Sequence, residues 1–176
     1  MMLTFRKFLV PVVLGLIFLI GVSAVYGGGP PLNIHETVRE TVTWTIPAGQ
    51  CPSLPAGLSV SGTGERHAVI NTKENSDGSS QIIINDVVKG TAVDSNGDTY
   101  RFIYTNHSIQ SVPAGGLPIQ FEMNDSFVLN GRGAAGNLAV GFVIRWSTTD
   151  PNDPTWPPPN VEIVNLRGEA FLCDPI

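Results

Sequence analysis

Apolar and polar residues alternate with a period of two through most of the chain beyond residue 35. In the segment VRETVTWTI (38–46) the even positions are mostly apolar and the odd positions are polar. The same alternation returns in segments 99–109 and 138–146. A period of two is typical of β-strands that bury one face. No amphipathic helical stretch of useful length follows residue 24.

Turn-forming residues divide this alternating sequence into seven runs. The other four runs cover about residues 58–71, 81–93, 119–129 and 161–172. Asp-Gly at 77–78 and Asn-Gly at 96–97 are hairpin signals, because these pairs adopt the positive φ of tight turns. Gly62 and Gly64 within the second run predict a bend or a β-bulge.

Consecutive strands joined by such turns predict an all-β fold, an antiparallel meander of about seven to eight strands. A meander of this size closes into a β-barrel or, alternatively, folds into a β-sandwich.

The first 24 residues have the character of an export signal. Arg6 and Lys7 precede an apolar run at 9–20, and small residues lead to Ala24. This order predicts a signal peptide over residues 1–24, cleaved after Ala24. The alternative is an uncleaved helical membrane anchor, because residues 8–25 carry no charge and just reach spanning length. Both alternatives place the rest of the chain outside the cytoplasm, either secreted or anchored and facing outside.

Residues 25–34 are rich in Gly and Pro and predict a flexible linker, and residues 35–176 form a single β domain. Removal of residues 1–24, which carry two basic residues and no acid, lowers the net charge from −5 to about −7. An acidic domain is a poor partner for nucleic acid or anionic lipid. We therefore expect membrane contact only through the N-terminal segment.

Cys51 and Cys173 are the two cysteines of the chain. Thiols outside the cytoplasm tend to pair, which predicts a Cys51–Cys173 disulfide. An odd number of meander strands supports this pairing, because it places the ends of the first and last strands at the same end of the sheet. The alternative is two reduced, buried cysteines that act as small apolar residues.

No motif for catalysis, metal or cofactor binding stands out. His35, His67 and His107 show no His-x-His spacing, and the loop 94–98 lacks the later Gly and Glu of a calcium loop. No Ser lies in a Gly-x-Ser-x-Gly motif. We therefore predict no catalytic residue, no metal and no cofactor.

Three charged residues have the parity of the apolar positions in their runs: Arg66, Asp86 and Asp125. If parity marks the inner face, all three point inward. Buried charges are costly unless they are paired, so such a cluster either forms a structural ion pair or lines a polar cavity. Because small barrels bind ligands in the lumen, these residues are the candidate ligand-binding site.

Three hypotheses of function follow. The first is a non-enzymatic module, either structural or binding a small apolar ligand. The second is a barrel-lumen enzyme that uses the inward Arg/Asp cluster. The third is a cell-surface interaction protein that acts through the Pro/Trp loop 147–160, because proline-rich segments can serve as recognition surfaces.

Two segments carry a family resemblance. ETVTWTIPAG (40–49) is followed closely by Cys51, and LRGEAFLC (166–173) ends on the second cysteine. With the signal sequence, this pattern resembles small, uncharacterised exported bacterial all-β proteins. The strand order is similar to meander barrels of the allene oxide cyclase and dirigent group. The resemblance implies a barrel fold, and it implies no activity and no functional residue.

Overall fold

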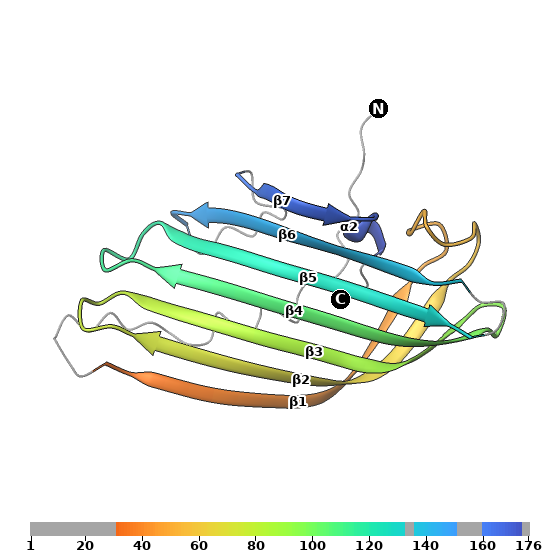
Figure 1. Ribbon diagram of the computed structural model, residues 1–176, viewed down its shortest axis with the longest axis horizontal. Helices are drawn as coiled ribbons and strands as arrows, with labels where there is room; N and C mark the ends of the chain where they lie inside the picture. Colours follow the sequence, from red (N-terminus) through yellow and green to blue (C-terminus); the bar gives the residue numbers. More distant parts are fainter. Residues whose placement is uncertain (1–30, 133–135, 151–159, 174–176) are drawn as a thin grey trace.

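The chain folds into one curled antiparallel sheet (Figure 1). The computed structural model describes residues 31–132, 136–150 and 160–173. Within them the strands follow the order of the sequence, each paired with the next. They are β1 (Asn33–Ile46), β2 (Val60–Glu74), β3 (Ser80–Asp94), β4 (Thr99–Val112), β5 (Ile119–Gly131), β6 (Leu138–Thr148) and β7 (Glu162–Arg167).

The predicted all-β antiparallel meander is therefore confirmed, with seven strands in the described residues. The sheet is not closed, because β1 and β7 lie at its two edges and do not pair with each other. The predicted signal or anchor, residues 1–24, lies outside the described residues. So does the linker up to residue 30, whereas β1 already begins at Asn33, within the predicted linker.

Glycines allow the sheet to curl where β2 and β3 cross its core. Figure 1 shows the C-terminal half of β1 and the N-terminal half of β2 bending behind the other strands. Gly64 lies opposite Gly90, and a Cβ on Gly90 would come within 2.1 Å of the carbonyl oxygen of Thr63. Strand pairing runs without interruption through Gly62 and Gly64, so the sequence signal there marks a bend and the alternative of a bulge is wrong.

The concave face of the sheet carries the hydrophobic core. Within the core, the ring of Trp44 packs edge-on against Phe102 at 5.0 Å and Phe127 at 5.3 Å between centroids. All three side chains are buried. They lie on the inner face that parity predicted, since successive side chains of a strand point to opposite faces.

The C-terminal segment departs from its prediction. The run 161–172 is not one strand: β7 ends at Arg167, and a short helix, α2 (Ala170–Cys173), follows. Gly168 adopts a φ of 63° and turns the chain out of the extended conformation. Among the described residues, no helix has the length and apolar character needed to cross a membrane.

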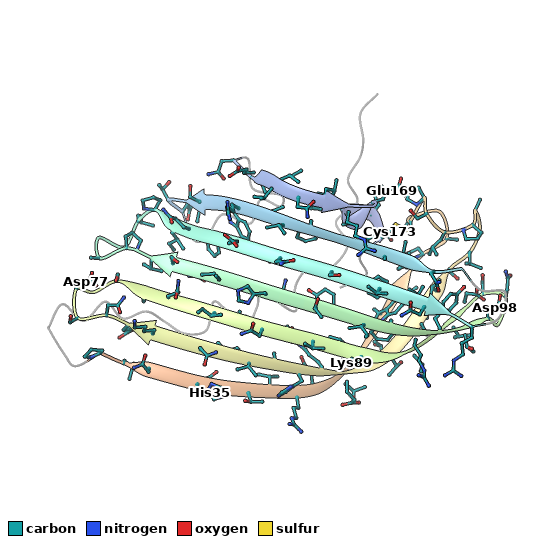
Figure 2. The ribbon with its side chains drawn as sticks, in the orientation of Figure 1. His35, Asp77, Lys89, Asp98, Glu169 and Cys173 are labelled. Carbon is teal, nitrogen blue, oxygen red and sulfur yellow. A yellow bond between two sulfur atoms is a disulfide. The ribbon has the colours of Figure 1, made fainter. Side chains whose placement is uncertain are left out.

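The predicted disulfide is confirmed, and it joins Cys51 to Cys173. Cys51 follows β1 and Cys173 ends α2, so the bridge links the two edges of the sheet at one end. Figure 2 shows Cys173 near Glu169 at the end of the sheet where β1 and β2 curl. Covalent linkage thus holds together two edges that backbone hydrogen bonds do not join.

Candidate functional site

Strand pairing aligns the predicted site residues across the middle of the concave face. Asp86, Asn106 and Asp125 are direct neighbours on β3, β4 and β5. Arg66 lies in the adjacent row on β2. Asp86 is 3% exposed and Asp125 is 4% exposed. The three residues that parity selected therefore all lie on the inner face.

Arg66 is held by two carboxylates. Its Nε and Nη2 lie 2.7 and 2.6 Å from Oδ2 of Asp86, and its Nη1 lies 2.6 Å from Oε1 of Glu40. Burial lowers the pKa of Arg66, but the hydrogen bonds to Asp86 and Glu40 outweigh it and raise this pKa above its ordinary value. Each guanidinium nitrogen already has a carboxylate partner, so Arg66 holds the side chains of Asp86 and Glu40 in position.

Asp125 belongs to a second hydrogen-bonded group. Its Oδ2 accepts hydrogen bonds from the hydroxyl of Tyr104 at 2.8 Å and from Nδ2 of Asn106 at 3.2 Å. The Oδ1 of Asn106 in turn accepts a hydrogen bond from the hydroxyl of Ser108. The structure thus brings Arg66 and Asp86 into contact and keeps Asp125 two strands away from Asp86, in a group of its own.

The buried side chain of Asp86 offers an acceptor that faces no donor in the described part of the chain. Among the described residues, Oδ1 of Asp86 has no partner, although the side chain is almost fully buried. An unsatisfied buried acceptor costs about 1–3 kcal/mol, so such atoms usually face a donor. Among the described residues of this cluster, one cation, Arg66, stands beside three carboxylates, those of Glu40, Asp86 and Asp125. This balance suits a neutral donor or a cation and disfavours an anion.

The polar row divides the concave face into a packed half and a more open half. Towards the disulfide, Phe102 and Phe127 are fully buried. On the other side, Phe121 and Trp146 stack at 4.7 Å with an angle of 5° between the rings, and both are only half-buried. Ile34, at the far end of this half, is exposed. Apolar surface therefore lies on the same face as the carboxylates, two rows of side chains away from Asp86 and Asp125.

Sequence reasoning missed three members of the site, Glu40, Tyr104 and Asn106. The signal was present, because each has the parity of buried neighbours in its strand. Parity alone could not show that Asn106 falls between Asp86 and Asp125, since that depends on the register of three strands.

The remaining candidates lie elsewhere. His35 and His107 are exposed, and their Nδ1 atoms pair with amide oxygens of neighbouring strands at 2.8 Å. In the described ranges, no group of three or more His, Cys, Asp or Glu side chains is placed to hold a metal. Residues 151–159 of the Pro/Trp loop lie outside the described residues; beside them, Nδ2 of Asn160 donates to the carbonyl oxygen of Ser147 at 2.7 Å.

Comparisons of the chain with protein families, with curated proteins and with solved structures find no match.

Proposed function

We propose that the chain is an exported, non-enzymatic module that binds a small ligand on the concave face of its sheet. The observation that carries the proposal is the buried Oδ1 of Asp86, which has no donor among the described residues. The ligand has an apolar body, which suits the half-buried surface of Phe121 and Trp146, and a hydrogen-bond donor or cationic group that reaches Asp86.

The state of Arg66 favours binding over catalysis. Its guanidinium nitrogens contact Asp86 and Glu40, so it has little capacity to polarise or activate a substrate. The carboxylates of Asp86 and Asp125 belong to separate groups on β3 and β5. Two strand spacings put their backbones about 10 Å apart.

The proposal includes a meander barrel outside the cytoplasm, as the resemblance to exported barrels implies. Two observations support it: the sheet curls, and the Cys51–Cys173 bridge ties its two edges at one end. A disulfide is compatible with that compartment. Intact mass of the exported protein tests this part: a chain that starts at Val25 supports secretion, and a mass that retains residues 1–24 supports the anchored alternative.

The ligand proposal is tested with the full chain, purified from the extracytoplasmic fraction and titrated with octylamine, octanol and octanoate. Tryptophan fluorescence reports binding, and native mass spectrometry identifies any compound that co-purifies. We expect octylamine to bind most tightly and octanoate least. The Asp86→Asn variant should weaken octylamine about tenfold or more, as expected for loss of a charge-assisted hydrogen bond.

Glu122→Gln is the matched control, because Glu122 lies on the outer face, where it pairs with Arg145 at 2.8 Å. It removes the same charge and should leave octylamine binding unchanged. Equal effects of Asp86→Asn and Glu122→Gln, or no binding of any of the three probes, would overturn the proposal.

A further inference from the structure

The outer face of the sheet carries a groove of about 780 Å³ that the concave site does not use. It crosses β1 to β4 where the sheet curls most strongly, and four strands at a spacing of about 4.8 Å make it about 14 Å wide. Exposed side chains of alternate residues line it, over a floor formed by the backbone of the buried residues between them.

Two rows of side chains run across the groove, and each row ends at an arginine. Register aligns the first row as Thr43, Thr63, Thr91 and Arg101. The second row is Thr45, Ser61, Val93 and Thr99. Arg132 ends this row, because its backbone N–H donates to the carbonyl oxygen of Thr99 at 3.1 Å. Six hydroxyl groups and two guanidinium groups therefore face the same groove.

The two arginines stand close to each other. Arg101 lies opposite Asn130, and Arg132 follows Asn130 by two residues, which makes the arginines diagonal neighbours on one face. Side chains in this relationship lie about 7–8 Å apart at the backbone and are within reach of each other when they are long. Two like charges at this distance repel each other, and an anion bound between them would offset that repulsion.

Among the described residues that line the groove, no acid offsets these charges. Neither Arg101 nor Arg132 has an ion-pair partner in the part of the chain that the structure describes, and no acidic residue is among the groove's lining. Figure 2 labels two residues that border the groove: Lys89 on β3, which lies opposite Glu65 in the strand register, and Asp98 in the turn before Thr99. The groove is thus locally positive on a chain with a net charge of −5.

Threonine on an exposed strand needs no special explanation, since β-branched residues favour strands. The arginines at the ends of the hydroxyl rows, which lack an ion-pair partner among the described residues, do need one. Arg binds carboxylate, sulfate and phosphate groups with paired hydrogen bonds, and hydroxyl groups both donate and accept. From these observations we infer that the groove binds an anionic carbohydrate. Its sugar hydroxyls bond to the Thr and Ser side chains, and its acidic groups bond to Arg101 and Arg132.

Affinity electrophoresis of the full chain through gels that contain polygalacturonate, dextran sulfate or neutral dextran tests this inference. We expect retardation by at least one of the acidic polymers, none by neutral dextran, and loss of retardation as salt rises. The double variant Arg101→Gln/Arg132→Gln should weaken binding about ten- to hundredfold, as expected for loss of charge-assisted hydrogen bonds. Thr63→Val/Thr91→Val should weaken it without a change of charge.

Arg39→Gln/Arg167→Gln is the matched control, because both arginines are exposed and neither lines the groove. It changes the net charge by the same amount and should leave retardation unchanged. If the two double variants weaken binding equally, the effect is that of net charge and the inference is wrong. It is also wrong if neither acidic polymer retards the protein. Octylamine binding should be unaffected by the groove variants, so this test is independent of the concave site.

Discussion

The hydroxyl of Tyr100 donates a hydrogen bond of 2.8 Å to Oδ2 of Asp94, across the tight turn that joins β3 to β4. The other carboxylate oxygen of Asp94 accepts the backbone N–H groups of Asn96 at 2.9 Å and Asp98 at 3.0 Å. One buried carboxylate thus organises the turn and anchors the first inward aromatic residue of β4.

Replacement of Tyr100 by Phe should lower the free energy of unfolding by about 1–3 kcal/mol, because Oδ2 of Asp94 then loses its donor while it stays buried. Urea unfolding measures the change. Ser76→Ala, in the exposed turn between β2 and β3, is the control and should stay within about 0.5 kcal/mol of the parent. A Tyr100→Phe variant as stable as this control would contradict the expectation.

The same pair predicts a loss of stability at both ends of the pH range. Burial raises the pKa of Asp94, but hydrogen bonds from Tyr100 and the turn backbone bring it below its ordinary value. The stability that ionised Asp94 contributes is therefore present above about pH 3.9, its pKa in the unfolded chain. This stability is lost as pH falls through the lower pKa of Asp94 in the folded chain. Burial and the bond to Asp94 raise the pKa of Tyr100 to about 12. The stability that protonated Tyr100 contributes is complete below about pH 10, its pKa in the unfolded chain, and is lost as pH rises through about 12.

Urea unfolding between pH 2 and pH 12 measures the loss of stability at low pH and the loss at high pH. In the Tyr100→Phe variant the free energy of unfolding should fall less above pH 10 than in the parent. Identical slopes for the two proteins in that range would exclude Tyr100 as the cause.

The contact between Gly64 and Gly90 predicts that the bend does not tolerate a side chain. In a Gly90→Ala variant the new Cβ would lie 2.1 Å from the carbonyl oxygen of Thr63 and 2.5 Å from Cα of Gly64. Backbone cannot move aside as a flexible side chain can, so we expect a loss of about 1–3 kcal/mol or more. Gly115→Ala is the matched control, because nothing lies within 4 Å of its added Cβ. Thermal unfolding of both variants tests this expectation. Equal midpoints would contradict it, because they would show that β2 and β3 can move apart without a loss of stability.

Much of the fold could be predicted because one physical rule, the alternation of strand side chains, covers most of the chain. It placed Trp44, Phe102 and Phe127 on the buried face and Arg66 among them. The rule failed at the C-terminus, where the apolar run 161–172 matches a strand as well as a short helix. There the positive φ of Gly168 and the position of Cys173 decide the conformation, and both depend on tertiary contacts.

The candidate sites were harder to predict, because they depend on register between strands. The pairing of Arg66 with both Asp86 and Glu40 requires three strands in one alignment. The outer groove requires four, so its threonines and Arg101 appear in the sequence only as ordinary polar strand residues. Slippage of one strand by one residue would move its side chains to the opposite face.

The disulfide predicts a stability that depends on redox conditions. It joins residues 122 positions apart, and a loop of that size restricts the unfolded chain strongly. The Cys51→Ala/Cys173→Ala variant should lose about 2–5 kcal/mol in the free energy of unfolding. Reductant should lower the stability of the parent to that of the variant and should leave the variant unchanged. An equal response of both proteins to reductant would mean that the bridge is not the cause.

The Arg66–Asp86 pair predicts strong energetic coupling. Arg66→Leu leaves the buried carboxylate of Asp86 without its cation, whereas Glu40 can turn to water because its side chain is 41% exposed. We expect Arg66→Leu to cost about 3–5 kcal/mol, and the double variant Arg66→Leu/Asp86→Leu to recover much of that loss, since apolar residues can replace a buried pair. Glu40→Gln should cost no more than about 1 kcal/mol, as for an exposed ion pair. Urea unfolding of the complete double-mutant cycle measures the coupling, and additive single losses would show that the two residues act independently.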